Sequence, residues 1–234
     1  MSSIRTWAVA GGVALLLMAA LAGFGNFAAI EGLVTWGDAE KTARDIAGSE
    51  GLFRAGVASL FLVIVLDVVV ACALYRVFAP VDRTVSLLAA AFRLVYTAVF
   101  MVALGSLLDA LRHVDQALLH LEAFDDLWKA GLGLFGVHLL LLGYLTFRSS
   151  QFPGWLGILL AIAGLGYLID SLGVFFGYDL AVSIYTFLGE LLLAIWLLIR
   201  ARHLEVNPRF RPMTGTTAEP ARGGDATATG PIRR

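Results

Sequence analysis

The residues of this chain whose types could do chemistry are ionisable groups that stand inside long apolar runs. They are Asp67, Arg93, His138, Asp170 and Glu190. A charge at the centre of a bilayer costs at least about 2.5–3.5 kcal/mol on insertion scales, so such groups should face the interior of a helix bundle and find partners there. Chains of Asp, Glu and His side chains at these depths are typical of transporters and proton relays.

The positions of two of these residues predict an ion pair. Asp67 lies just past the middle of its apolar run, and Arg93 lies shortly before the middle of the next run. The linker between the runs, 79–84, is short, so the two segments should be antiparallel neighbours. At a rise of about 1.5 Å per residue, the two side chains then differ in height by only a few ångströms. We therefore predict that Asp67 pairs with Arg93.

The other three ionisable residues are placed less tightly by the sequence. His138 and Glu190 both lie near the middle of their runs, at matching depth, which allows a second interaction. Asp170 lies nearer the outer side, where it could meet Tyr178 or the outer loops instead. The whole set could line a polar path, or it could consist of paired groups that only fix helix register. Interhelical polar bonds in membranes average below about 1 kcal/mol, so they can be retained for specificity without transport.

The elements that must position these groups are membrane-spanning helices. The chain has 234 residues, of which 59% are hydrophobic and only 15% are charged, with a mean hydropathy of +0.82. A bilayer core of roughly 30 Å needs about 20 mainly apolar residues in a helix. Six segments meet that length: 7–30, 52–78, 85–108, 127–147, 155–176 and 180–199. The first is longer than the usual apolar stretch of a signal peptide, so we expect it to be retained.

The distribution of basic residues predicts the orientation of these six spans. One side carries Arg5, Arg76, Arg83, Arg148, Arg200, Arg202, Arg209 and Arg211. The other side carries Lys41, Arg44, Arg112 and Lys129, with Arg54 just inside a helix end. The richer side should be cytoplasmic, since cytoplasmic loops carry an excess of Lys and Arg. Both termini then lie in the cytoplasm, in agreement with an even number of spans.

Two outer loops are long enough to have structure of their own. From 38 to 48 we predict a short helix, because Asp38 can cap it, Glu40 and Arg44 are spaced for an i,i+4 pair, and Gly48 can end it. From 109 to 122, apolar residues recur on one helical face. That pattern suits an amphipathic segment that lies in the membrane interface or extends the third helix outward, and equally a solvent-exposed helical hairpin extension.

The chain divides into two parts by composition. Residues 1–204 form the predicted transmembrane domain. Residues 205–234 contain four prolines, several Gly and Thr, and almost no large apolar residue. Such a segment cannot bury enough surface to fold, so we predict a disordered cytoplasmic tail.

Several other patterns indicate less than they first suggest. The run from Gly131 to Gly136 matches G-x-G-x-x-G, but no strand precedes it, so close helix packing explains its glycines better than a dinucleotide does. His113, Asp115, His120 and Glu122 lack a tight metal-ligand motif, and a polar helix face explains them more simply. We predict no metal and no cofactor. Nothing in the chain concentrates Lys and Arg beside aromatic residues, so no nucleic-acid partner is expected.

The order of several short motifs resembles a family of uncharacterised bacterial multi-pass membrane proteins, the domain-of-unknown-function 4386 family. The matching stretches are Gly37-Asp38-Ala39, 49–54, 87–95, 137–145, 153–157, 164–171 and Gly189-Glu190. Together they cover nearly the whole chain up to about Arg202. The loop 111–124 has no matching motif, and the tail lies outside the resemblance.

This resemblance implies a multi-pass membrane protein and no established activity. The patterned segments of the family include the five ionisable residues above, together with Glu50 and Arg54 at the outer end of the second segment.

The sequence as a whole predicts an all-α bundle of six transmembrane helices in the cytoplasmic membrane. Its partners would be the lipid bilayer and either another protein or a second copy of the chain. Our first hypothesis is a small transporter or permease-like protein that uses the ionisable set. The alternative is a non-catalytic membrane partner or regulatory subunit. An intramembrane enzyme acting on lipids comes third, because no Ser or Cys nucleophile has a recognisable base beside it in the sequence.

Overall fold

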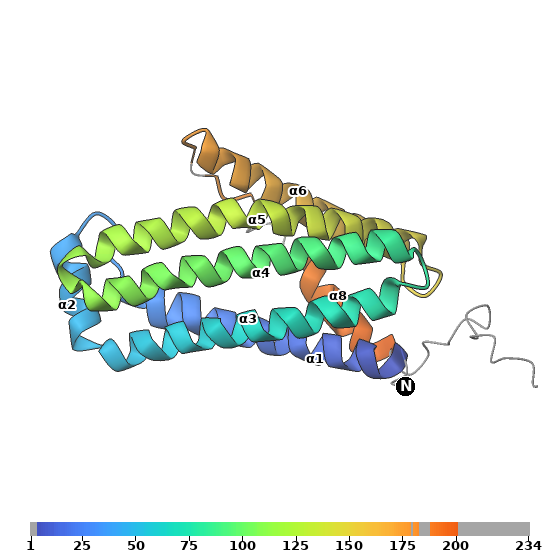
Figure 1. The fold of residues 1–234 in the computed structure, drawn as a ribbon, viewed down its shortest axis with the longest axis horizontal. Helices are drawn as coiled ribbons and strands as arrows, with labels where there is room; N and C mark the ends of the chain where they lie inside the picture. Colours follow the sequence, from blue (N-terminus) through green and yellow to red (C-terminus); the bar gives the residue numbers. More distant parts are fainter. Residues whose placement is uncertain (1–3, 179, 183–187, 201–234) are drawn as a thin grey trace, which may run out of the picture.

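The computed structural model describes residues 4–178, 180–182 and 188–200, and within them it contains helices and no strand (Figure 1). Among the described residues, five helices are long and apolar enough to cross a membrane. In chain order the elements are α1 (Ile4–Ala22), η1 (Gly23–Ile30), η2 (Glu31–Leu33), α2 (Ala39–Gly48), α3 (Glu50–Phe78), α4 (Arg83–Arg112), η3 (Val114–Gln116), α5 (Ala117–Arg148), α6 (Gly154–Phe175) and α8 (Leu188–Arg200).

The long helices pack in the order of the chain and are then joined by the last one. α1 packs against α3, α3 against α4, α4 against α5, and α5 against α6, while α8 packs against both α1 and α6 (Figure 1). α8 therefore connects the two edges of the bundle. The first five predicted spans are confirmed as helices, and the fourth, α5, begins ten residues before its predicted start.

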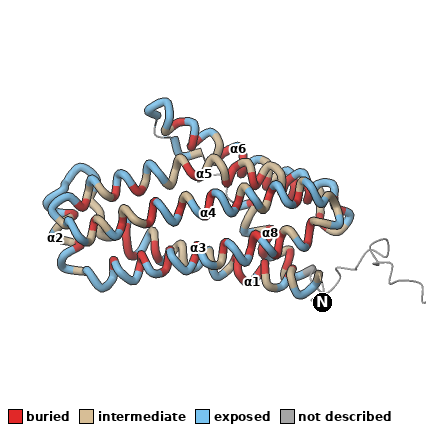
Figure 2. Tube along the Cα trace, viewed as in Figure 1, coloured by how far each residue is buried: buried red, intermediate tan, exposed pale blue. Residues whose placement is uncertain are grey.

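The outer surface of the bundle is apolar. Buried residues follow the inward side of each helix, and exposed residues cover the outside (Figure 2). The exposed side chains include many large aliphatic ones, such as Val102, whose side chain is 67% exposed, and Leu87, Leu172 and Ile162. A soluble protein rarely exposes an apolar surface of this extent. Together with helix length, this surface agrees with an integral membrane protein.

The two outer loops are both helical. α2 begins where predicted, with the Asp38 carboxylate accepting a hydrogen bond from the Lys41 backbone N–H at 2.8 Å, and it ends at Gly48. Glu40 pairs with Arg44 at 3.5 Å. The segment 109–122 forms the tip of the α4–α5 hairpin, with α4 extending to Arg112 and α5 beginning at Ala117. The helical extension is therefore confirmed, and the location of this tip at the membrane interface or in solvent stays a prediction. α2 packs across this tip and buries Ile46 completely.

The first span changes its helical geometry before it ends. Residues Gly23–Ile30 form a π-helix, and Glu31–Leu33 a 3-10 turn. The Ser59 hydroxyl of α3 donates a hydrogen bond to the Leu21 carbonyl at 2.7 Å, close to where the π-helix begins. A Cβ atom added at Gly56 would lie 2.6 Å from the Ala29 Cβ atom, so the two helices are in close contact along this stretch. The sequence did not indicate this wider helix.

The glycines of α5 act as helix-packing residues. A Cβ atom at Gly136 would lie 2.6 Å from the carbonyl oxygen of Gly164, and one at Gly143 would lie 2.7 Å from that of Gly157. These reciprocal contacts bring the α5 and α6 backbones together, which confirms the packing interpretation of the run from Gly131 to Gly136. Gly177 has another role, since it follows the end of α6 with φ +75°, a conformation that favours glycine.

The predicted sixth span, 180–199, is the main departure from expectation. Leu180, Ala181 and Val182 are not helical, so that part of the prediction was wrong. Residues 183–187 lie outside the described residues. The remainder forms α8, which has 13 residues and rises about 20 Å, less than a bilayer core of about 30 Å. The predicted tail, 205–234, also lies outside the described residues.

Candidate functional site

Four of the five ionisable residues lie at one level of the bundle. Arg93 is ten residues from Arg83 at the start of α4, and eleven residues separate Asp67 from Phe78 at the end of α3. His138 and Glu190 are each ten residues from the last residue of their helices, α5 and α8. At about 1.5 Å per residue these positions are about 15–17 Å from the same end of the bundle, near the middle of a bilayer core.

Asp67 and Arg93 form the predicted ion pair. The Arg93 Nε atom donates a hydrogen bond to Asp67 Oδ1 at 2.7 Å, and its Nη2 atom contacts the same oxygen. Both side chains are only 2% exposed. One turn further along α4, the Thr97 hydroxyl donates to the Arg93 carbonyl at 2.7 Å. The prediction from matching depth is therefore confirmed, and the pair joins α3 to α4.

His138 extends this pair to α5. Its Nδ1 atom lies 2.8 Å from the carbonyl oxygen of Ala89, and its Nε2 atom lies 3.2 Å from Nη1 of Arg93. A carbonyl can only accept and a guanidinium can only donate, so Nδ1 carries the proton and Nε2 presents its lone pair. This assigns the neutral Nδ1–H tautomer. The ring is 1% exposed and is held at both nitrogens.

Glu190 joins the same level from α8, where it lies in the first turn of the helix. Its carboxyl group accepts a hydrogen bond from the Tyr167 hydroxyl of α6, and it is close enough to Arg93 and Asp67 for their charges to interact. Glu190 is half-buried, unlike the pair it approaches. His138 and Glu190 therefore do not pair with each other as the sequence allowed. His138 pairs with Arg93 and the Ala89 carbonyl, whereas Glu190 pairs with Tyr167. We call Asp67, Arg93, His138, Tyr167 and Glu190 the mid-bundle cluster.

Phe135 packs at the centre of the mid-bundle cluster. Its ring centroid lies 5.1 Å from the Arg93 guanidinium carbon, 5.5 Å from the His138 ring and 5.5 Å from the Tyr167 ring. It also packs at 4.9 Å against Tyr96, whose hydroxyl accepts a hydrogen bond from the Trp128 indole at 3.0 Å. Phe135, Tyr96 and Tyr167 could not be singled out from the sequence, because an aromatic residue within an apolar run is indistinguishable from ordinary core.

Asp170 lies apart from the cluster, as its position nearer the outer side predicted. Its Oδ1 atom accepts a hydrogen bond from the backbone N–H of Val182 at 2.7 Å, and its side chain is 4% exposed. The next residue, Ser171, donates to the Ala130 carbonyl at 2.8 Å. Asp170 therefore binds the segment that follows α6, which agrees with the predicted alternative that it meets an outer loop.

The outer-end pair is also separate from the mid-bundle cluster. The Arg54 Nε atom donates to Glu50 Oε1 at 2.7 Å, and both side chains are more than half exposed. The pair lies in the first turns of α3, whereas Asp67 lies in the second half of that helix. An exposed i,i+4 pair of this kind contributes about 0.3–0.5 kcal/mol.

The chemistry open to the mid-bundle cluster follows from its charges. Asp67 and Glu190 are carboxyl groups, Arg93 is a cation, and His138 is neutral in the tautomer assigned above. The positive charge of Arg93 neutralises one carboxylate, that of Asp67, which occupies the Nε and Nη2 donors of Arg93. Glu190 is therefore the member best placed to take up and release a proton. Across the part of the chain that the structure describes, no three His, Cys, Asp or Glu side chains gather as metal ligands.

Comparison with known proteins places the chain in a family. The model of the family described as "Domain of unknown function (DUF4386)" matches residues 10–201. An uncharacterised protein of Archaeoglobus fulgidus is 43% identical over 148 residues, which are 63% of this chain and 85% of that protein. No solved structure matches the chain. All five members of the mid-bundle cluster lie within the matched residues, and the chain belongs to the DUF4386 family.

Proposed function

We propose that this protein is a small transporter of the cytoplasmic membrane, with both termini in the cytoplasm, in which Glu190 carries a proton as part of a solute- or proton-linked flux. The proposal depends on one observation. Residues 180–182 are irregular backbone held to Asp170 through the Val182 N–H, and Glu190 lies in the first turn of α8, a helix of 13 residues.

This arrangement supports transport for a physical reason. Irregular backbone at membrane depth is tolerated only where protein surrounds it or where it lines a water-filled cavity. In many transporters, short helices of this kind begin near the midplane and form the binding site with their first residues. Glu190 occupies that position here, and its neighbour Arg93 could interact with an anion when Glu190 moves.

The placement of basic residues supports the proposed orientation. Arg83 and Arg148 lie at the end of the bundle that also holds the start of α1, while Lys41 and Arg112 lie at the opposite end, near α2 and the hairpin tip (Figure 1). An excess of Lys and Arg marks the cytoplasmic side.

Proton flux into proteoliposomes tests the transport proposal. The purified protein is reconstituted with a pH-sensitive dye inside, and a potassium diffusion potential drives proton entry. We expect a protein-dependent flux that is lost in Glu190→Gln, because the amide cannot carry the proton, and is partly kept in Glu190→Asp. Glu50→Gln provides the matched control and should retain the flux. An unchanged flux in Glu190→Gln, or the absence of any protein-dependent flux, would overturn the proposal.

A specific observation favours the alternative of a non-catalytic partner protein. Asp67, Arg93 and His138 are almost fully buried and bonded to one another, which is what groups that only fix helix packing require. Under this alternative, the protein isolated in mild detergent should carry a second protein in fixed stoichiometry, and that partner should remain with Glu190→Gln. Recovery of the chain alone would argue against it.

A further inference from the structure

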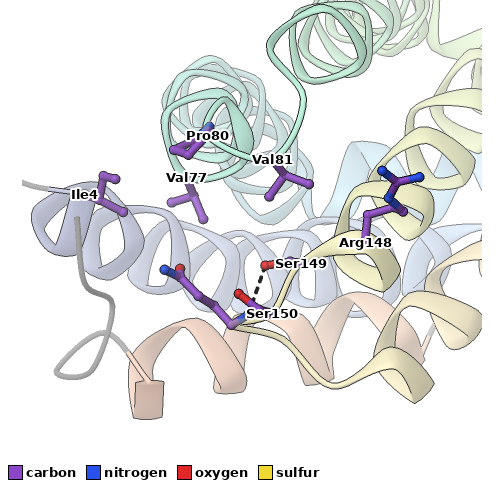
Figure 3. A pocket seen from close by; sticks show the side chains of 8 residues that line it. Ile4, Val77, Pro80, Val81, Arg148, Ser149 and Ser150 are labelled. Atoms are coloured by element: carbon purple, nitrogen blue, oxygen red, sulfur yellow. Dashed lines mark hydrogen bonds between the residues drawn. The ribbon is translucent and has the colours of Figure 1, made fainter. Parts of the chain in front are cut away.

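A pocket of about 250 Å³ opens at the basic end of the bundle, away from the mid-bundle cluster (Figure 3). It lies where the α3–α4 linker and the α5–α6 linker approach the first turn of α1. Binding sites for drug-sized ligands are about 300–1,000 Å³. This pocket is slightly smaller, so its size suits a headgroup or a small anion.

The two walls of the pocket differ in polarity. Ile4, Val77 and Val81 supply apolar side chains from α1, α3 and the α3–α4 linker. The facing wall comes from the end of α5 and the loop after it, where Arg148 and Ser150 are exposed toward solvent (Figure 3). A pocket with one apolar wall and one cationic, hydroxyl-bearing wall matches a ligand that is itself amphipathic.

The polar wall is arranged to receive an anion. The Ser149 hydroxyl oxygen accepts a hydrogen bond from the Gln151 backbone N–H at 3.2 Å, which fixes the turn of the loop (Figure 3). The Arg148 guanidinium carbon lies 5.8 Å from the Tyr144 ring centroid, and the side chain is exposed. Arginine binds phosphate oxygens through paired N–H donors.

The charges around the pocket favour an anionic ligand as well. Of the eight residues that line it, one is charged, Arg148, and none is acidic.

We infer that this pocket binds the phosphate of an anionic phospholipid headgroup, with Arg148 as its main polar contact. The pocket lies at one end of the apolar bundle, at the level of the polar headgroups when the helices span the hydrocarbon core. Basic pockets between transmembrane helices on the cytoplasmic side are typical sites for anionic headgroups. The acyl chains would then lie along the apolar side chains of α1 and α3. This inference does not depend on transport by the mid-bundle cluster.

Native mass spectrometry of the protein released from mixed phosphatidylglycerol and phosphatidylcholine nanodiscs tests the inference. We expect the wild-type protein to retain phosphatidylglycerol in preference to phosphatidylcholine. Arg148→Gln should lower that preference about fivefold, because it removes the paired N–H donors that would contact the phosphate in the pocket. Ser150→Glu, which introduces a carboxylate at an exposed position of the pocket, should lower it as well.

Two controls separate the pocket from general surface charge. Arg83→Gln removes a positive charge from the same end of the bundle outside the pocket, and Thr84→Glu adds a negative charge there. Both should leave the lipid preference close to that of the wild type. Equal losses in Arg83→Gln and Arg148→Gln, or an unchanged preference in Arg148→Gln and Ser150→Glu, would overturn the inference.

A separate measurement distinguishes a lipid headgroup from free phosphate. Inorganic phosphate is added to the detergent-solubilised protein at constant ionic strength, and its thermal unfolding is compared with that in short-chain phosphatidylglycerol. If only the lipid stabilises the protein, and this stabilisation is lost in Arg148→Gln, the result supports binding of a lipid headgroup. Equal stabilisation by inorganic phosphate would show that the pocket binds the free anion instead, and would overturn the lipid assignment.

Discussion

The Nε atom of Arg93 lies 2.7 Å from Oδ1 of Asp67, and this contact joins α3 to α4 at the middle of the bundle. Both side chains are 2% exposed, so neither charge can turn to water when its partner is removed. The stability of the protein should therefore depend strongly on keeping the two residues together.

We predict that Asp67→Asn lowers the free energy of unfolding by about 3–5 kcal/mol, because it leaves the Arg93 guanidinium buried without a counter-charge. Thermal unfolding in detergent, followed by size-exclusion chromatography, measures this loss. The double variant Asp67→Leu with Arg93→Met should recover much of it, since apolar residues of similar volume can replace a buried pair.

Glu50→Gln is the matched control for this prediction. It breaks the exposed Glu50–Arg54 pair and should cost only about 0.3–0.5 kcal/mol. Similar losses at the buried and the exposed pair would contradict the idea that burial makes the Asp67–Arg93 pair important.

His138 should contribute through two hydrogen bonds rather than through packing alone. His138→Phe keeps an aromatic ring of similar shape but leaves the Ala89 carbonyl and the Arg93 Nη1 group without their present partner. A buried unsatisfied polar group costs about 1–3 kcal/mol, and we expect a loss of at least that size. His138→Gln, whose amide can donate and accept, should lose less. If both variants unfold at the same temperature, the assigned hydrogen bonds do not determine the effect.

Phe135 should contribute more to the stability of the protein than an ordinary core phenylalanine, since its ring centroid lies 5.1 Å from the Arg93 guanidinium carbon. A cation–π contact in a desolvated site contributes about 2 kcal/mol. We therefore expect Phe135→Leu to destabilise the protein by about 2 kcal/mol or more in thermal unfolding. Phe61→Leu, at a position that is 45% exposed on the outside of α3, should have little effect and serves as the control.

The contact between α5 and α6 should not tolerate even one added methyl group. Gly136→Ala would place a Cβ atom 2.6 Å from the Gly164 carbonyl oxygen, and overpacking of this kind costs about 1–3 kcal/mol. Gly105→Ala on α4 is the comparison, because no atom lies within 4 Å of the added methyl group. It should stabilise the helix by about 0.5–1 kcal/mol. Equal effects of the two substitutions would show that the helices can separate without cost.

Much of this protein could be predicted from its sequence, because the strongest constraint on it is local. A bilayer requires about 20 apolar residues in each spanning helix, so apolar runs marked five helices directly. The Asp67–Arg93 pair was predictable for a related reason, since a short linker makes two helices neighbours and the rise per residue then gives the depth of each side chain. The cap of α2 followed from its own residues in the same way.

Only the tertiary structure decided the remaining features of the site. The pairing of Glu190 with Tyr167 and the position of Phe135 against Arg93 depend on helices that are distant in the sequence. Residues 180–182 are apolar enough to predict the start of a span, yet they are not helical, and the Val182 N–H donates to the Asp170 carboxylate instead. The hydropathy of a sequence shows which segments avoid water, but it does not show which side chains of different helices contact one another.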